Sequence, residues 1–491
     1  MGEKPALKIP NVSEESYKWW VLASIALGTF MGPLDGSIVN IALPSISSYF
    51  HTSLAMVEWV VMSYLLMISS LLLTYGRLGD MYGHKPIYLG GFVIFTLGSA
   101  LCGFSPGIGF LIGARVLQAV GAGMMMAIGP AIVTSTFPPH LRGRALGMNG
   151  SVVASALAFG PAIGGLLLSQ FGWRSIFFVN LPIGIIGTLW AVRILRRDER
   201  LVRHRFDIPG AVTIFAGLMF LLLSLSHGGE WGWSSPAVLF SLAAAVVFLG
   251  LFIYLELRSP EPMMDLRLFR IRLFAAANAT SLLNFMAQFS ITFLLPFYLE
   301  QVRHLNPAHA GLVLSAPPFL ILFVAPLSGA LSDRIGSRLL SSLGMAITAA
   351  GMFWLSRVGV ATPYAVIVAG MAVFGLGTGL FQAPNNSAIM GSVPRQRLGT
   401  ASGTLASMRN IGMVLGIALS GAVFSGRLPV HDAVLRALGR HGAALQAQAF
   451  TMSMQDAYLV GASLAALGVL TSLVRGRAAA PAPRPDTGDK K

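Results

Sequence analysis

Asp35 and Arg115 are oppositely charged residues that lie inside long apolar segments of the sequence. A charged side chain in hydrocarbon is costly, so such residues are paired or functional by default. Asp35 lies about eight residues before the end of segment 19–43, and Arg115 about seven residues after the start of segment 108–134. At a rise of about 1.5 Å per residue, both lie roughly 10–12 Å from one membrane face if the segments run in opposite directions. The pair is predicted either to exchange protons as its separation or its access to water changes, or to form a permanent salt bridge.

Two further charged residues, Glu58 and Arg409, lie at or inside apolar segments. Glu58 begins segment 54–75, where water at the interface would solvate it without any special role, and proton transfer is the functional alternative. Arg409 lies about nine residues inside segment 400–425. It is expected either to reach the surface or bond to backbone carbonyls, or to contact an anionic group or a substrate.

Uncharged polar residues and a run of three methionines inside the apolar segments are candidates for a substrate cavity. Hydrogen bonding between helices is the commoner role of such polar residues, whereas methionine side chains adapt to varied ligands. The candidate cavity residues are Asn40, Gln118, Met124, Asn284, Gln288, Asn385, Asn386 and Arg409. A cavity with so few fixed charges suits lipophilic or cationic compounds, with Asp35 or Glu58 as the counter-charge.

The elements that must position these residues are predicted to be membrane-spanning helices. Apolar residues make up 55% of the chain and charged residues 11%, and the mean hydropathy is +0.71, whereas a soluble domain is about 25% charged. A helix needs roughly 20 apolar residues to cross about 30 Å of hydrocarbon. Fourteen such segments are predicted, at 19–43, 54–75, 86–104, 108–134, 143–169, 175–195, 208–227, 236–256, 273–299, 309–331, 339–357, 362–388, 400–425 and 455–475.

Lysine and arginine are distributed unevenly among the connections between these segments. Of the 34 Lys and Arg residues, 26 fall in the two terminal stretches and the even-numbered connections, and six in the odd-numbered ones. Basic residues accumulate on the cytoplasmic side, so both termini are predicted to be cytoplasmic. The net charge of +15 is spread over short clusters, which argues against a nucleic-acid partner.

The long connection before the last segment has apolar residues at a roughly helical spacing. Its sequence DAVLRALGRHGAALQAQAF, residues 432–450, predicts an amphipathic helix lying in the membrane interface. A solvated helix is the alternative.

A short pattern, G-x-L-x-D-x-x-G-x-[K/R], occurs after the second and after the tenth segment. Its positions are Gly76, Asp80, Gly83 and Lys85 in the first copy and Gly329, Asp333, Gly336 and Arg338 in the second. Glycine permits a tight turn with positive φ, and an aspartate just ahead of a helix would cap its free N–H groups. Two copies at equivalent places predict a duplicated helix bundle around a midplane cavity, which is the plan of a transporter.

These two loops resemble the signature loop of the major facilitator superfamily, and three further stretches resemble its fourteen-helix drug:proton antiporters, the EmrB/QacA type. The stretches are LDGSIVNIALPSI at 34–46, LIGARVLQAVGAG at 111–123 and GWRSIFFVNLPIG at 172–184. The resemblance covers nearly the whole chain and implies two six-helix bundles with two additional helices between them. It also implies a link between Arg115 and proton transfer, with the proton as coupling ion and no other cofactor.

The fifth segment carries a row of small residues that is similar to the antiporter motif of this family. The row comprises Gly147, Gly160, Pro161, Gly164 and Gly165, with Ala156 where another small residue is usual. Such residues allow close packing against a partner helix, with a bend at the proline. The resemblance implies that this motif marks an exporter.

The predicted fold class is an all-α polytopic membrane protein with a bundle at 1–198, linking helices at 199–260, a second bundle at 261–478 and a disordered cytoplasmic tail at 479–491. The predicted function is proton-coupled export of small amphiphilic or cationic compounds from the cell membrane. A lipid or glycolipid flippase, or an exporter of one metabolite, is the alternative. The sequence has no phosphate loop, metal-ligand pair or nucleophile elbow, so an enzyme is not expected. The expected partners are the lipid bilayer and a small-molecule substrate, with the protein as a monomer and any accessory protein unspecified.

Overall fold

The computed structural model describes residues 14–138, 141–196, 207–259, 262, 264–394 and 397–475, without the side chains of a few residues inside helices. The tail predicted at 479–491 lies outside this part. Fourteen helices of the described residues are long and apolar enough to cross a membrane, and each overlaps one predicted segment, which confirms the fourteen spans. The domain boundaries predicted at 198, 260 and 478 fall on residues that are not described and stay predictions.

The N-terminal bundle is built from six spans, two of which are interrupted by a short break. Its helices are α1 (Glu14–Phe50), α2 (Leu54–Val57), α3 (Trp59–Tyr82), α4 (His84–Gly103), α5 (Ile108–Thr136), α6 (Arg142–Phe171), α7 (Ser175–Phe178) and α8 (Asn180–Ile194). The breaks fall at Glu58, between α2 and α3, and at Val179, between α7 and α8. Within the bundle, α1 packs on α5, α6 and α8, and α5 packs on α3 and α4.

The C-terminal bundle repeats this arrangement. Its elements are η1 (Leu266–Arg270), α11 (Arg272–Phe297), η2 (Tyr298–Val302), α12 (Pro307–Leu314), α13 (Ala316–Ile335), α14 (Ser337–Leu355), α15 (Tyr364–Gly391), α16 (Leu398–Ala437) and α17 (Gly442–Leu473). The pair α14 and α15 corresponds to the pair α4 and α5, and each pair is in close contact.

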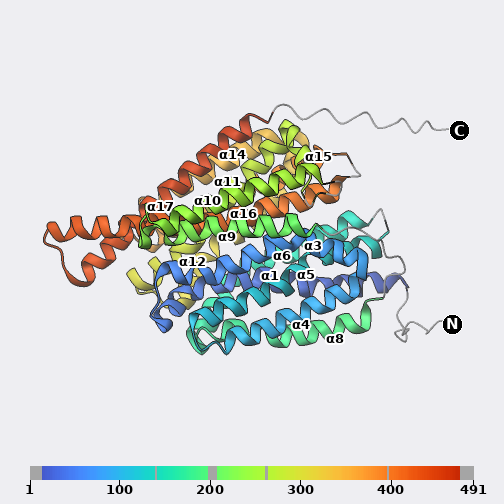
Figure 1. Cartoon of the computed structure of the whole chain (residues 1–491), viewed down its shortest axis with the longest axis horizontal. Helices are drawn as coiled ribbons and strands as arrows, with labels where there is room; N and C mark the ends of the chain where they lie inside the picture. Colours follow the sequence, from blue (N-terminus) through green and yellow to red (C-terminus); the bar gives the residue numbers. More distant parts are fainter. Residues whose placement is uncertain are drawn as a thin grey trace.

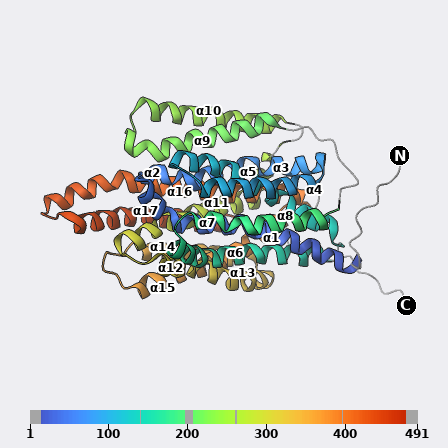
Figure 2. The ribbon, with the colours of Figure 1, turned by 90° about the horizontal axis from the view of Figure 1, so that it is seen from below.

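Two additional helices, α9 (Ile208–Trp231) and α10 (Pro236–Arg258), form a layer along one side of the molecule (Figure 2). Of the two, α9 contacts both α3 of the first bundle and α16 of the second, whereas α10 packs mainly on α9. The large apolar side chains of Phe240 and Val246 on α10 are exposed, as expected for a face that meets lipid. The layer therefore covers one seam between the bundles.

Both chain ends of the described part lie at one end of the molecule, and the α16–α17 hairpin projects from the other (Figure 1). We call these the termini end and the hairpin end. The amphipathic helix predicted at 432–450 is wrong as a separate interfacial element. This stretch instead continues α16 and α17 as a helical hairpin with a turn at residues 438–441. The hairpin has its own small core of Leu435, Leu445 and Ala449.

The two signature loops form equivalent turns between consecutive helices. Gly83 between α3 and α4 has φ 97°, and Gly336 between α13 and α14 has φ 87°, so the positive φ predicted from the pattern is confirmed. Asp80 and Asp333 lie inside the preceding helices, and Gly83 and Gly336 occupy the cap positions, so neither aspartate is itself the N-cap residue. The predicted interaction of their carboxylates with the following helices stays a prediction. The two aspartate side chains lie outside the described part.

Glycines bring the paired helices into close contact in both bundles. In α4, an added Cβ at Gly91 would meet the backbone of Gly121 on α5, and in α14 one at Gly344 would meet the backbone of Gly377 on α15. Gly91 follows Gly83 of the first signature loop at the same distance along the chain as Gly344 follows Gly336 of the second. The duplication predicted from the loops therefore extends into the packing of the helices.

Candidate functional site

Asp35 of α1 and Arg115 of α5 form an ion pair in the interior of the N-terminal bundle. Arg115 Nη1 lies 2.5 Å from Asp35 Oδ2, and both side chains are completely buried. The two residues that the sequence placed at a similar depth are therefore in contact. Because α1 extends to Phe50, Asp35 lies farther from the end of its helix than the segment 19–43 implied.

Neighbouring helices supply further hydrogen bonds to this pair. Asp35 Oδ1 accepts from Gln118 Nε2 at 2.8 Å and from Asn180 Nδ2 at 2.9 Å. Arg115 Nε donates to Val60 O at 3.0 Å, and its guanidinium group lies 4.0 Å from the centre of the Tyr64 ring. The charge of Asp35 is therefore balanced in this state and is not free to hold a cationic cargo.

Two residues of this network have roles that the sequence did not assign. Gln118 was a candidate for the cavity wall, but it bonds to Asp35, Arg115 and Ser99. Asn180 starts α8 at the break after α7, and it was not singled out. A polar residue two positions before a proline inside an apolar segment was the available signal, but its partner is on α1, 145 residues away in sequence.

Glu58 is completely buried, so the prediction of a solvated acid at the interface is wrong. It lies at the break between α2 and α3, where Ser226 Oγ of α9 donates a hydrogen bond to its Oε1. An added Cβ at Gly421 of α16 would meet its carboxylate. Glu58 therefore lies where the N-terminal bundle, α9 and the C-terminal bundle meet, near the hairpin end.

The small residues on α6 have different neighbours at the two ends of the helix. Added Cβ atoms at Gly160 and Gly164 would meet α1, and one at Gly165 would meet the backbone of Pro307 on α12. An added Cβ at Gly147 would meet no atom within 4 Å. Pro161 takes part in the same contact, since an added Cβ at Gly311 of α12 would meet its carbonyl oxygen.

Glycines on α3 and α16 show the same difference between the termini end and the hairpin end. Towards the termini end, added Cβ atoms at Gly76 of α3 and Gly399 of α16 would meet no atom within 4 Å, as at Gly147. Towards the hairpin end, Gly165 and Gly421 lie against the other bundle. The bundles are therefore in contact near the hairpin end, whereas these three glycines near the termini end adjoin open space.

The predicted cavity residues of the N-terminal bundle are engaged in local contacts. Asn40 Nδ2 donates to Gly36 O at 3.0 Å within α1. Met124 packs on Gly90 and Gly91 of α4, which favours helix packing over a place in a cavity wall. An added Cβ at Gly36 would meet no atom within 4 Å, so open space adjoins α1 one residue from Asp35.

The predicted cavity residues of the C-terminal bundle include several polar atoms without partners. Both side-chain polar atoms of Asn284, Gln288 Oε1 and Arg409 Nε are buried without a hydrogen bond in the described part. Asn385 is different, because it donates to Ala277 O at 3.2 Å and accepts from Arg475. Asn386 is partly exposed.

The basic residues of the two signature loops differ in their contacts. Lys85 Nζ donates to Val192 O at 2.8 Å and also to Leu195 O, so it binds the last carbonyls of α8. Arg338 in the second loop is exposed. The two copies are therefore equivalent in backbone but not in side-chain contacts.

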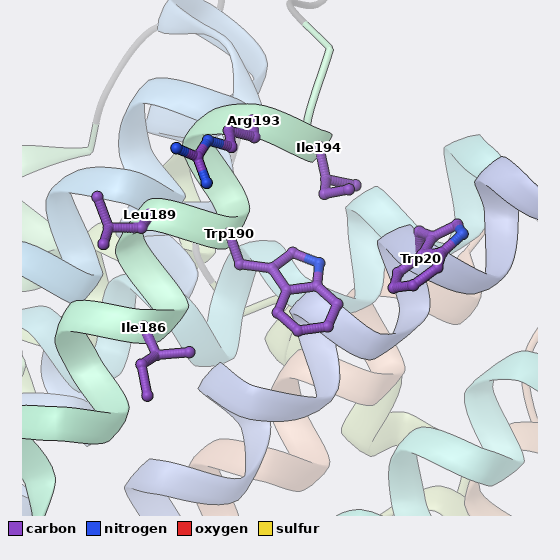
Figure 3. Close-up of a pocket in the computed structure, with 6 residues that line it drawn as sticks. All are labelled: Trp20, Ile186, Leu189, Trp190, Arg193 and Ile194. Atoms are coloured by element: carbon purple, nitrogen blue, oxygen red, sulfur yellow. The ribbon is translucent and has the colours of Figure 1, made fainter. Parts of the chain in front are cut away.

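A groove of about 410 Å³ lies on the side of the N-terminal bundle, between α1 and α8 (Figure 3). It is lined by Trp20, Ile186, Leu189, Trp190, Arg193 and Ile194. Two tryptophans and an arginine near the end of a span are typical of the interface between hydrocarbon and lipid headgroups. Asp35 does not line this groove and lies about 20 Å farther along α1 than Trp20.

Comparisons with known proteins agree with this architecture. The model of the Major Facilitator Superfamily matches residues 25–417. Riboflavin transporter RibZ of Clostridioides difficile (strain 630) is 34% identical over 459 residues, which cover 93% of this chain and 97% of that protein. Multidrug resistance protein Stp of Mycobacterium tuberculosis (strain CDC 1551 / Oshkosh) is 35% identical over 405 residues, which cover 82% of this chain and 75% of that protein.

A solved structure shares the fold. The crystal structure of a bacterial homologue of the human lysosomal transporter Spinster, inward-facing and unoccupied, has a TM-score of 0.69 at 16% identity. The match covers 98% of this chain and 100% of that chain. Together with the fourteen spans and the duplicated loops, these matches show that the chain is a multi-pass membrane transporter that belongs to the Major Facilitator Superfamily.

Proposed function

We propose that the protein exports small amphiphilic compounds in exchange for protons by alternating access. The observation that carries this proposal is the ion pair between Asp35 and Arg115, which is completely buried in one bundle. Burying two charges has a desolvation cost that their attraction only partly repays, and proton coupling is a common use of intramembrane carboxylates.

The contacts of α1 offer a route from proton binding to bundle movement. Ser37 and Ile38, close behind Asp35, lie against Gly160 and Gly164 of α6. Ile41, on the same helix, lies near Gly311 of α12 in the other bundle. Protonation of Asp35 would weaken its attraction to Arg115, and the resulting shift of α1 would reach the contact between α6 and α12.

The proposed direction of transport is outward. The distribution of Lys and Arg predicts that the termini end faces the cytoplasm, so the open space beside Gly76, Gly147 and Gly399 would face the compartment from which an exporter takes its cargo. The small-residue motif on α6 and the similarity to multidrug resistance protein Stp support the same direction.

Transport of one dedicated compound, rather than of many, is the second candidate function. It is favoured by the similarity to RibZ, described as a riboflavin transporter, over nearly the full length of both proteins. A panel of compounds that includes riboflavin, amphiphilic dyes and labelled lipids distinguishes a dedicated transporter, a multidrug exporter and a flippase.

Asp35→Asn tests proton coupling directly. In proteoliposomes with an imposed pH gradient, the native protein is expected to move its cargo against a concentration gradient, and the variant is expected to lose this uphill movement. The variant must still elute as a folded protein from size-exclusion chromatography. Undiminished uphill transport by Asp35→Asn would exclude Asp35 as the coupling residue. No response of the native protein to the pH gradient with any compound of the panel would overturn the antiporter proposal.

A further inference from the structure

The interiors of the two bundles differ in how their arginines are compensated. Arg115 in the N-terminal bundle is paired with Asp35. In the C-terminal bundle, Arg409 Nε is buried without a hydrogen-bond partner, and so are Nε and Nη1 of Arg475, which is only 2% exposed. No acidic side chain of the described residues pairs with either arginine.

The acidic side chains of the second half that the structure describes lie away from these arginines. Glu300 is in η2, after the far end of α11, where its Oε1 is buried without a hydrogen bond in the described part. Asp265, just before η1, lies 2.8 Å from Arg397. Asp432 and Asp456 belong to the projecting hairpin, where Asp456 pairs with Arg427 at 2.6 Å. Among the described side chains, the two arginines therefore have no acidic counter-charge beside them; the side chain of Asp333 lies outside this part.

The two arginines lie at the same level of the bundle. Helices α11 and α16 run side by side in a constant register, because Ser420 Oγ lies 2.5 Å from Ser290 Oγ and an added Cβ at Gly412 would meet Leu282 O. Arg409, one turn before Gly412, is therefore level with the second turn of α11.

Asn385 places Arg475 at that level as well. Its side chain donates to Ala277 O in the second turn of α11 and accepts a hydrogen bond from Arg475 Nη2. Helices α15 and α16 are in contact, and α17, which ends next to Arg475, packs on both α11 and α16. The two guanidinium groups thus belong to one cross-section of the C-terminal bundle, nearer the termini end than the hairpin end.

Other polar atoms at this level also lack partners. Ser407 Oγ and Asn410 Nδ2 on α16 and Asn278 Oδ1 on α11 are buried without a hydrogen bond in the described part. We call Asn278, Ser407, Arg409, Asn410 and Arg475 the arginine layer. Its groups are mainly hydrogen-bond donors, and a carboxylate or phosphate accepts several such bonds at once.

We propose that the arginine layer binds the anionic group of a small organic cargo. The inference rests on the proposed export function, since it names the class of compound that the protein would carry. It replaces the expectation of a cationic cargo, because Asp35 is already bonded to Arg115 and Glu58 lies away from this level, near the hairpin end. In the predicted orientation, the layer lies in the half of the bundle that is nearer the cytoplasm.

Equilibrium binding to two xanthene dyes of opposite charge tests the proposal. The purified full-length protein is titrated with carboxyfluorescein, an anion, and rhodamine 6G, a cation, and fluorescence anisotropy is recorded without a pH gradient. Arg409→Gln and Arg475→Gln are each expected to weaken binding of carboxyfluorescein about tenfold or more, because each removes a charge-assisted hydrogen-bond donor. Arg409→Lys is expected to retain part of the affinity because it keeps the charge. Binding of rhodamine 6G is expected to be weaker than that of carboxyfluorescein.

Arg357→Gln is the charge-matched control, because this exposed arginine lies beyond the far end of α14. Its affinity for carboxyfluorescein should equal that of the native protein. Thermal unfolding of each variant identifies any loss of fold, and Arg409→Gln carries the test if Arg475→Gln does not fold. Native-like affinity in both glutamine variants, or tighter binding of rhodamine 6G, would overturn the inference.

Two further arms separate the possible explanations. In nanodiscs, displacement of the dye by phosphatidylglycerol but not by phosphatidylcholine, in an Arg409-dependent way, would assign the layer to a lipid headgroup and overturn the cargo proposal. The binding measurement needs no gradient, so an Arg409-dependent anion affinity supports the layer even if Asp35→Asn shows that the coupling proposal is wrong. If the native protein shows gradient-driven transport but Arg409→Gln and Arg475→Gln bind carboxyfluorescein like the native protein, the coupling proposal is supported and the arginine layer is excluded as the anion site.

Discussion

At the scale of single residues, the Asp35–Arg115 pair is stable because each charge has a partner and most of its polar atoms are hydrogen-bonded. Removing one member of a buried pair leaves an uncompensated charge, which costs about 3–5 kcal/mol. Gln118 and Asn180 complete the shell of Asp35 from α5 and α8. Three helices are thereby held at one point of the N-terminal bundle.

A double-mutant cycle measures how strongly the two charges depend on each other. Arg115→Gln alone is expected to lower the unfolding free energy by about 3–5 kcal/mol, because Asp35 stays buried without a counter-charge. Combining it with Asp35→Asn is expected to recover much of this loss, since both charges are then absent. Unfolding of the purified protein in detergent gives the stabilities, with Arg357→Gln as a surface control. Simple additivity of the two single losses would show that the pair is not energetically coupled.

At the scale of elements, α6 is the helix through which the two bundles touch and separate. Its half towards the hairpin end packs glycines against α1 and α12, whereas Gly147 in the other half faces open space. A helix that is tightly packed at one end and open at the other can act as a lever between two conformations. Helix α16 shows the same contrast, because Gly399 adjoins open space whereas Gly421 lies against Glu58. The contact between α3 and α16 is therefore also tight only near the hairpin end.

Two glycine-to-alanine substitutions in α6 test the difference in packing between its two halves. Gly165→Ala is expected to force α6 away from Pro307 and Ala308 and to cost about 1–3 kcal/mol of the hairpin-end contact, because the new methyl group meets backbone. Gly147→Ala is expected to leave stability unchanged or slightly higher, since the methyl group enters open space in a helix. Thermal unfolding and transport rates check both variants. Equal effects of the two substitutions would contradict this account of α6.

At the scale of the whole molecule, α9 and α10 are not a passive insertion between the bundles. Helix α9 lies along the seam between α3 and α16 (Figure 2), and Ser226 bonds to Glu58 at the point where all three parts meet. Opening at the hairpin end must separate α3 from α16, so this contact must break or move. Helices α9 and α10 therefore help to stabilise the conformation in which the hairpin end is closed.

Removing the Glu58 contact is expected to shift the conformational equilibrium. Glu58→Ala and Ser226→Ala should raise the population with an open hairpin end, because each removes a contact made only in the closed arrangement. Distances between spin labels at the hairpin ends of α3 and α16 report this population, after the single cysteine, Cys102, is replaced by serine. Ser224→Ala is the matched control, because the hydrogen bonds of Ser224 in the described part go to Phe220 O and Leu221 O within α9. Identical distance distributions in the Glu58 variant and the native protein would show that Glu58 does not hold the closed state.

Much of the architecture follows from local sequence properties. Apolar segments of sufficient length become helices in a membrane because every backbone N–H and C=O must be bonded within the segment, and so the fourteen spans could be predicted. The positive φ of Gly83 and Gly336 follows from a turn that few other residues can form. The extent of α16 and α17 could not be predicted in the same way, since residues 432–450 are amphipathic and their position depends on how the two helices pack on each other.

The order of the residues alone specifies which side chains are charged, where the helices run and that two similar bundles exist. It also placed Asp35 and Arg115 at comparable depths, because depth depends only on the distance along a helix. The burial of Glu58, the bond from Asn180 to Asp35 and the level shared by Arg409 and Arg475 follow only from how the helices pack in space. Each of these depends on helices that are distant in sequence, and the solvation and pairing of a side chain are properties of its neighbours in space.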